Sequence, residues 1–157
     1  MIDVLLPLND NIRNRRLGGG KMVVVARRNH PAVHGHIDLQ SYLAHEHVLA
    51  SSRSSGPGME DLELSRVGLQ RRIRLRCQHF ATACNVVSMS DLLLTMPEHY
   101  ARATNEALDN QVVPFPIDVN VQDIFLYWHA RAEDDGANRW LRNNIVPLFD
   151  TSQVSAF

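Results

Sequence analysis

Residues 23–52 read VVVARRNHPAVHGHIDLQSYLAHEHVLASS, and this stretch decides the fold. It begins with a β-branched apolar run and then passes a turn signal at residues 29–31, Asn-His-Pro. Asp38 can cap a short helix through Leu43, and a second apolar run follows at Val48–Ala50. Strand, helix and strand in this order are typical of an α/β domain, so the sequence predicts a sheet covered by helices.

The same alternation continues along the rest of the chain. The expected strands are Val4–Leu8, Met22–Ala26, Val48–Ala50, Ile73–Cys77, Leu92–Met96, Val112–Phe115 and Ile124–Trp128. The expected helices are Asp38–Leu43, Gly58–Val67 closed by Gly68, Ala81–Val87, Glu98–Leu108 and Ala137–Phe149. In the last helix Trp140, Leu141 and Ile145 recur at helical spacing, so we expect this stripe, Trp140 included, to be buried against a sheet.

Two other patterns predict peripheral structure. Residues 17–20, Leu-Gly-Gly-Gly, predict a turn or a weak point before the second strand, and GGGK lacks the flanking residues of a phosphate-binding loop. Four arginines, Arg71, Arg72, Arg74 and Arg76, alternate along an expected strand, and we interpret them as cover for a solvated surface.

Composition limits the function. The chain has 157 residues, a net charge of −1 and no basic patch typical of nucleic-acid binding. Its two cysteines, Cys77 and Cys84, are expected to be free thiols in a reducing compartment. The N-terminal apolar stretch precedes its positive charges, unlike a secretory signal, and no apolar run could cross a bilayer. We therefore expect a cytoplasmic protein without a membrane segment.

Three stretches carry a family resemblance. The first is residues 23–52, with R-x-x-H-P at 27–31 and L-x-x-Y-L at 39–43. The second is GLQRRIRLRCQHFATACNVVSMSDLLLTMPEHYA at 68–101, and the third is IFLYWHARAEDDGANRWLRNNI at 124–145, with WHA and WLR. In this order and spacing the chain resembles the effector-binding domain of LysR-type transcription regulators, in the branch that senses flavonoids and nitroaromatics.

The resemblance implies an α/β fold of the type 2 periplasmic-binding-protein class, with two Rossmann-like subdomains joined by crossover strands. The crossovers map near Val24–Arg27 and Val119–Asp123. Residues 1–23 would be a remnant of the first subdomain, 24–121 the complete second subdomain, 122–150 the return segment and 151–157 a tail. No winged helix-turn-helix is matched, so the expectation is a truncated member that does not bind DNA by itself.

Ligands of such sheets bind at the carboxyl ends of the strands. The loop after Val48–Ala50 offers hydroxyls and backbone N–H groups to an anionic or electron-rich group, through Ser51, Ser52, Ser54, Ser55, Gly56 and Gly58. The loop after Ile73–Cys77 offers Gln78, His79 and Phe80, of which His79 can donate a hydrogen bond and Phe80 can pack on a ring. Asp123, at the second crossover, is equally interpretable as a solvated strand residue. An ordinary helix cap and a structural histidine remain alternatives for the two loops.

The predicted function is effector sensing: a small aromatic inducer in the cleft between subdomains, with homo-oligomer formation and no cofactor. The histidines at 30, 34, 36, 45 and 47, and the group Cys77, His79 and Cys84, lack the pairings of a zinc site. There is no nucleophile elbow, so an enzyme is not expected, and Cys84 is interpreted as a packed thiol. A solute-binding protein of the same fold and an oligomerising fragment remain as alternatives.

Overall fold

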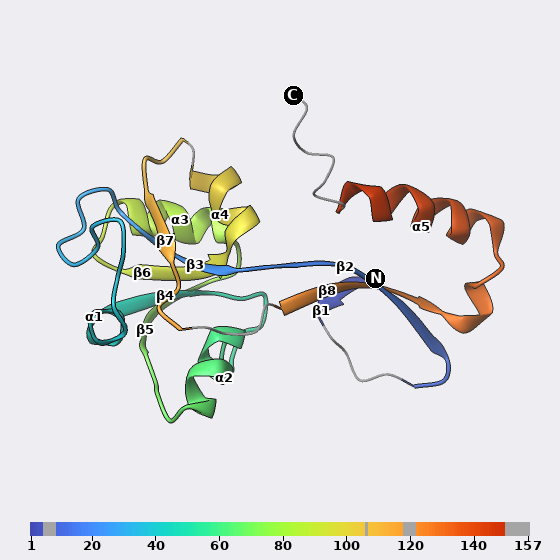
Figure 1. The fold of residues 1–157 in the computed structure, drawn as a ribbon, viewed down its shortest axis with the longest axis horizontal. Helices are drawn as coiled ribbons and strands as arrows, with labels where there is room; N and C mark the ends of the chain where they lie inside the picture. Colours follow the sequence, from blue (N-terminus) through green and yellow to red (C-terminus); the bar gives the residue numbers. More distant parts are fainter. Residues whose placement is uncertain (5–8, 106, 118–121, 150–157) are drawn as a thin grey trace. The chain divides into compact units, whose positions relative to one another are not determined.

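A computed structural model describes residues 1–4, 9–105, 107–117 and 122–149 (Figure 1). The chain divides into two compact units. Unit 1 consists of Met1–Gly20 with Val121–Phe157, and unit 2 is Lys21–Asn120. The chain thus leaves unit 1 at Gly20, just before the expected first crossover. The second expected crossover and the expected strand at 4–8 fall largely on residues outside those described. The assignment of the units to the family's two subdomains stays a prediction.

Unit 2 is built on a five-stranded sheet. Its strands are β3 (Met22–Ala26), β4 (Glu46–Ala50), β5 (Arg72–Cys77), β6 (Leu93–Pro97) and β7 (Gln111–Pro114), in the order β5-β4-β6-β3-β7. Strand β4 is parallel to β5 and β6, whereas β3 is antiparallel to β6 and β7. The central strands are buried on both faces, which explains their continuous apolar sequences.

Four helices pack on the two faces of this sheet (Figure 1). They are α1 (Leu39–Ala44), α2 (Met59–Arg66), α3 (Phe80–Ser88) and α4 (Glu98–Asn105). Ala83, Val87 and Ala101, from α3 and α4, pack with Val25 in one core cluster. Tyr42 and Leu64, from α1 and α2, pack with Val24 and Leu93 in the other cluster. The predicted α/β class is confirmed, and the unit has three layers.

One side chain fixes the loop between β3 and α1. The Gln111 amide nitrogen donates to the carbonyl oxygens of Arg27, Arg28 and Val33 at 2.9, 3.1 and 2.8 Å. Its Oε1 accepts a hydrogen bond from the backbone N–H of Gly35 at 3.2 Å. Gln111 therefore satisfies main-chain groups along the loop, of which the Arg27 carbonyl oxygen also accepts a hydrogen bond from the His30 N–H at 3.1 Å.

Unit 1 contains a three-stranded antiparallel sheet, and here one prediction is wrong. Strand β8 (Gln122–His129) lies between β1 (Ile2–Val4) and β2 (Ile12–Gly20). The segment expected to be a turn, residues 17–20, is instead the end of β2, where Gly18 pairs with Ile124. A register irregularity between Arg16 and Gly18 accommodates the extra residue, and Leu17 is buried there. Pairing with β8 keeps the glycines extended despite their low strand propensity.

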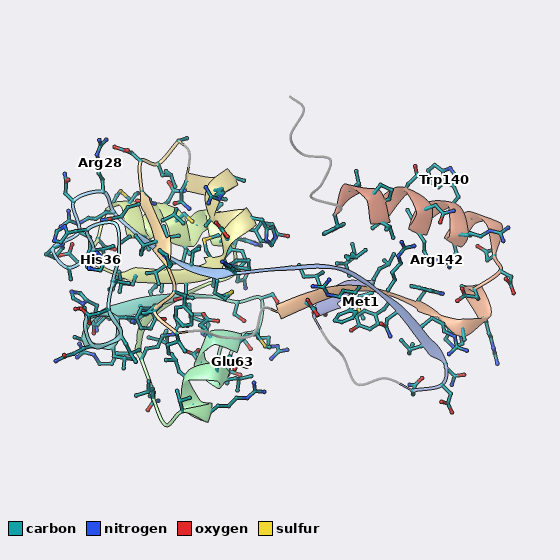
Figure 2. The ribbon with its side chains drawn as sticks, in the orientation of Figure 1. Met1, Arg28, His36, Glu63, Trp140 and Arg142 are labelled. Carbon is teal, nitrogen blue, oxygen red and sulfur yellow. The ribbon has the colours of Figure 1, made fainter. Side chains whose placement is uncertain are left out.

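The last helix, α5 (Gly136–Leu148), also departs from expectation. Among its residues, all of which are described, none is buried, and Trp140 is 66% exposed. Figure 2 shows Trp140 on the outer side of α5, whereas Arg142 points toward the strands of unit 1. The Arg142 guanidinium lies 4.7 Å from the Trp128 ring and donates to the carbonyl oxygens of Ala132 and Glu133 at 3.0 and 2.6 Å. Polar and cation–π contacts therefore hold a helix whose apolar stripe predicted burial.

None of the helices in the described part of the chain combines the length and apolar character needed to span a membrane.

Candidate functional site

Two predicted loops start side by side at one edge of the unit 2 sheet. Strands β4 and β5 are parallel, with Ala50 opposite Cys77 in the register. Past the last strand residue, the backbone N–H of Ser51 donates to the carbonyl oxygen of Cys77 at 2.8 Å. Because both strands end here, the loop of residues 51–58 and the loop of residues 78–79 leave from the same edge, as the ligand sites of α/β sheets require.

The loop of residues 51–58 is exposed to solvent, and hydrogen bonds fix it near both ends. The Ser51 Oγ accepts a hydrogen bond from the Arg53 N–H at 3.2 Å, and the serines at 52, 54 and 55 are exposed. Gly56 has a φ of +90°, a backbone conformation that favours glycine. Its carbonyl oxygen accepts a hydrogen bond from Nη2 of Arg76 at 2.6 Å. Strand β5 therefore holds the far end of the loop.

Gly58 ends this loop and caps α2. A Cβ atom at this position would lie 2.7 Å from both the Leu49 Cδ1 and the Glu60 Oε2, so only glycine fits without displacement. The backbone N–H of Gly58 donates to Asp61 Oδ2 at 2.6 Å. Gly58 is buried, so in this structure it serves to position the loop and offers no surface to a ligand.

The basic segment after Gly68 contains a further wrong prediction, because Arg71, directly before β5, is buried. Its side chain is 0% exposed and pairs with Glu60 and Asp61 of α2, each at 2.5 Å. Burial opposes the charge on Arg71, but the Tyr42 hydroxyl and the two carboxylates outweigh it and raise the pKa of the guanidinium. The acidic first turn of α2 is thus fixed to the residue directly before β5. Arg72 and Arg74, in contrast, are exposed as expected.

Tyr42, Thr95 and His47 extend this buried cluster. The Tyr42 hydroxyl lies 2.7 Å from Thr95 Oγ1 and accepts a hydrogen bond from Arg71 Nη1 at 3.2 Å. Nε2 of His47 donates to the Tyr42 carbonyl oxygen at 2.8 Å. Burial and the nearby charge of Arg71 lower the pKa of His47 to about 3, so its ring is neutral near pH 7. Sequence reasoning missed the cluster; only Asp61, three residues after the Gly58 cap, follows a recognised capping pattern.

The second loop offers an exposed histidine beside a packed aromatic ring. Gln78 and His79 are exposed, and His79 is the N-cap of α3 without a side-chain hydrogen bond to the helix. The Phe80 ring stacks on Tyr100 of α4, with centroids 5.7 Å apart and planes at 26°. Among the described residues the His79 imidazole makes no hydrogen bond to its helix, whereas the face of Phe80 toward Tyr100 is already used.

Asp123 belongs to unit 1, whereas these loops belong to unit 2. It is on β8 of unit 1 and forms an ion pair with Arg16 at 2.7 Å. The hydrogen bond from Arg16 and its charge lower the pKa of the Asp123 carboxyl. Its observed partner is thus a neighbouring strand residue.

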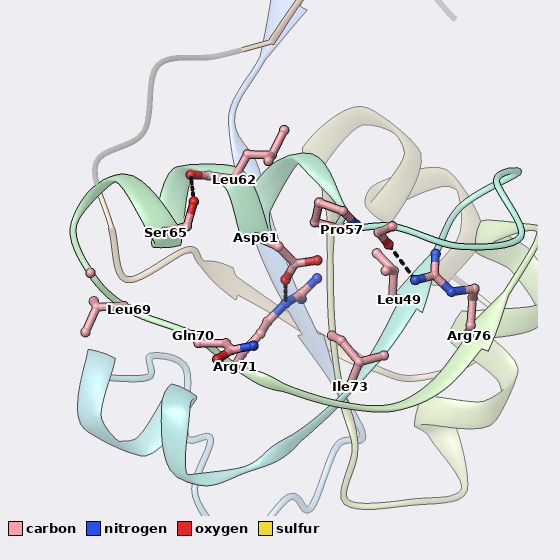
Figure 3. A pocket seen from close by; sticks show the side chains of 12 residues that line it. Leu49, Pro57, Asp61, Leu62, Ser65, Leu69, Gln70, Arg71, Ile73 and Arg76 are labelled. Carbon is pink, nitrogen blue, oxygen red and sulfur yellow. Dashed lines mark hydrogen bonds and ion pairs between the residues drawn. The ribbon is translucent and has the colours of Figure 1, made fainter.

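A groove lies between α2 and β5, and we call it the α2–β5 groove (Figure 3). Its volume is about 530 Å³, within the range of small-molecule sites. It is lined by Leu49, Gly56, Pro57, Asp61, Leu62, Ser65, Gly68, Leu69, Gln70, Arg71, Ile73 and Arg76. Of the predicted ligand residues, Gly56 is the member that the groove includes.

The cysteines and histidines of the described ranges form no metal site. Within residues 1–4, 9–105, 107–117 and 122–149, no three metal-ligating side chains are placed to share an ion. Cys77 and Cys84 are free and buried, and burial raises the pKa of the Cys77 thiol. The Cys84 sulfur packs 3.7 Å from the Met96 sulfur, as a packed thiol does.

Comparison with known proteins agrees with this architecture. The family model of the LysR substrate binding domain matches residues 1–149. The chain belongs to this family. Among curated LysR-type relatives, the HTH-type transcriptional activator NahR of Pseudomonas putida is 33% identical over 146 residues, which are 92% of this chain and 49% of that protein. NagR of a Ralstonia species is 32% identical over 92% of this chain and 48% of its own length. The chain spans about half the length of these relatives.

Solved structures show the same LysR effector-domain fold. A probable transcriptional regulator of Pseudomonas aeruginosa superimposes with a TM-score of 0.81 at 31% identity, over 89% of this chain and 45% of that one. The effector-binding domain of QuiR in complex with shikimate gives 0.75 at 19% identity, over 96% and 71% of the two chains. That of BenM with its effector benzoate gives 0.71 at 14% identity, over 96% and 68%. The last two show the fold alone.

Proposed function

We propose that the chain is the effector-sensing part of a LysR-type transcription regulator and that it binds a small aromatic inducer at the loops of residues 51–58 and 78–80. The observation that carries this proposal is the common origin of the two loops at the ends of β4 and β5, fixed by the Ser51 to Cys77 hydrogen bond. Hydroxyls and an unengaged imidazole there can bind a carboxylate or a phenolic oxygen. The ligands of QuiR and BenM, shikimate and benzoate, are both carboxylates.

A bound inducer would act by favouring one arrangement of the effector domain over another, which requires unequal affinity for the two. The regulator's output would pass through the DNA-binding part found in LysR-type proteins. We place the protein in the cytoplasm, where regulators meet DNA and where two free buried thiols persist.

Titration followed by NMR tests the proposed site. Benzoate, shikimate, phenol and a flavonoid are added in turn to the ¹⁵N-labelled chain, and the amide shifts of Ser52, His79 and Phe80 are recorded. At least one ligand should give saturable shifts there, and His79→Ala should weaken its binding about tenfold, the loss of one hydrogen bond to a charged group. His36→Ala, at an exposed histidine in the loop before α1, is the matched control. No response at these amides to any of the four ligands contradicts the proposal for this chain.

We also propose that the chain associates with copies of itself. Strand β5 is at an edge of its sheet and leaves Leu75 39% exposed. An apolar side chain on an open strand edge favours pairing with another chain. Sedimentation velocity should show a dimer or larger species that Leu75→Glu shifts toward the monomer, whereas a monomer at every concentration would refute association.

A further inference from the structure

The α2–β5 groove has an apolar wall and one incompletely bonded cation. Leu49 of β4, Leu62 of α2 and Ile73 of β5 contribute the apolar lining. Leu62 and Ile73 are 41% and 38% exposed, so a ligand in the groove would remove apolar surface from water. The groove therefore provides a binding surface for an apolar body of small size.

Arg76 also lines this groove (Figure 3). Its Nη2 is bonded to the Gly56 carbonyl oxygen at 2.6 Å. Its Nη1 is buried and has no hydrogen-bond partner among the described residues. A buried donor without a partner is costly, and a guanidinium matches the two oxygens of a carboxylate best.

The other charges in the groove leave Arg76 without a counter-ion. Asp61 is the acidic lining residue, and its carboxylate is already bonded to Arg71 and to the Gly58 N–H. Arg71 in turn also pairs with Glu60. Within the described residues, Arg76 makes no ion pair of its own, so its guanidinium has no direct carboxylate partner beside the apolar wall of the groove.

We propose that the α2–β5 groove is a second ligand site, separate from the loops at 78–80, and that it binds a small organic acid with one carboxylate on an apolar body. The carboxylate pairs with Arg76, and the apolar body packs on Leu49, Leu62 and Ile73. This site goes beyond the proposed effector site: it shares Gly56 with the loop of residues 51–58 but uses none of the residues at 78–80.

The test uses the complete chain, labelled with ¹⁵N and with ¹³C methyl groups, and benzoate as the probe. Saturable shifts at Leu69 and Ile73 are expected. Benzyl alcohol, which keeps the ring but has no charge, should not saturate these signals over the same concentrations. Arg76→Gln should weaken benzoate binding about tenfold or more, because a charge-assisted hydrogen bond is lost. Arg74→Gln, at an exposed arginine on the same strand outside the groove, should bind as the wild type does.

Ile73→Ser offers a second route, since it removes apolar lining from a partly exposed position and leaves Arg76 in place. It should also weaken binding. Equal shifts from benzyl alcohol, unchanged affinity in Arg76→Gln, or shifts confined to His79 and Phe80 would each overturn the groove site. Shifts at Leu69 and Ile73 without any at His79 and Phe80 would support the groove and count against benzoate at the effector loops, so the two proposals fail separately.

Discussion

Helices α2 and α5 are positioned in opposite ways. Helix α2 has a weak apolar stripe, yet its first turn is held by two carboxylates that pair with a fully buried arginine. Helix α5 has a clear apolar stripe, yet none of its described residues is buried, and Arg142 holds it through backbone carbonyls and the Trp128 ring. The difference teaches that amphipathic pattern alone does not reveal what fixes a helix. A buried charge pair fixes one geometry, whereas exposed contacts leave a helix loosely held.

The largest effect is expected from Arg71→Met. It leaves Glu60 and Asp61 without their buried counter-charge, so the free energy of unfolding of unit 2 should fall by about 3–5 kcal/mol. Hydrogen exchange at Val48 and Leu94, in the core strands, measures this. Arg72→Met, at the exposed next residue, should change this free energy by less than about 0.5 kcal/mol. Similar losses in the two variants would show that α2 is not fixed by the pair.

Acid should destabilise unit 2 through His47. Its folded pKa of about 3 is below the ordinary value of 6.5, so the folded state resists protonation. The contribution of neutral His47 to the free energy of unfolding is fully present above pH 6.5. It is lost as the pH falls from 6.5 toward 3, by about 1.4 kcal/mol per pH unit at most. Urea unfolding at a series of pH values across this range measures the free energy of unfolding. This free energy should change less steeply with pH for His47→Phe than for the wild type. His36→Phe, at an exposed position, should keep the wild-type slope, and equal slopes in all three proteins would contradict the assignment.

A smaller effect is expected from Gly58→Ala. The added Cβ would meet Leu49 and Glu60 at 2.7 Å, so the first turn of α2 must shift at a cost of about 1–3 kcal/mol. Gly136→Ala in α5 meets nothing within 4 Å and should be neutral or stabilise by up to about 1 kcal/mol. Thermal melts followed by circular dichroism compare the two. If Gly58→Ala melts no lower than Gly136→Ala, the packing at the α2 cap is looser than described.

The smallest effect is expected in α5. Arg142→Ala removes the cation–π contact and two carbonyl hydrogen bonds, which should cost about 1 kcal/mol locally. Hydrogen exchange of the α5 amides should accelerate accordingly, while that of Val48 stays unchanged. Trp140→Ala, at a side chain that is 66% exposed, should change neither. Faster exchange in Trp140→Ala than in Arg142→Ala would mean that the stripe predicted from the sequence is buried after all.

Periodicity and capping predicted most of unit 2. The strand Met22–Ala26 was predicted to the residue, Asp38 caps α1 through the Ser41 N–H, and Gly68 has the expected left-handed φ of +74°. These features depend on near neighbours in the sequence. Arg71 was misplaced because its burial depends on carboxylates from a preceding helix, which a strand pattern does not contain. Strand β2 was missed because its glycines are extended only by pairing with β8, more than a hundred residues later.

The candidate site divides in the same way. The two loops could be placed at one sheet edge because strand order alone predicts it. The α2–β5 groove could not be predicted from the sequence, because it depends on the orientation of Arg76 toward Gly56 and on the distance between α2 and an edge strand. Neither follows from local sequence.

The Gln111 contact has a consequence for sequence variation. All four of its hydrogen bonds go to main-chain atoms, three carbonyl oxygens and one N–H, at positions spread over the segment from Arg27 to Gly35. These contacts do not depend on the side chains of the segment. Relatives that keep a glutamine here can therefore vary the exposed loop residues, such as Arg28 and His34, and keep the loop shape, whereas His30 and Val33 are also constrained by their burial.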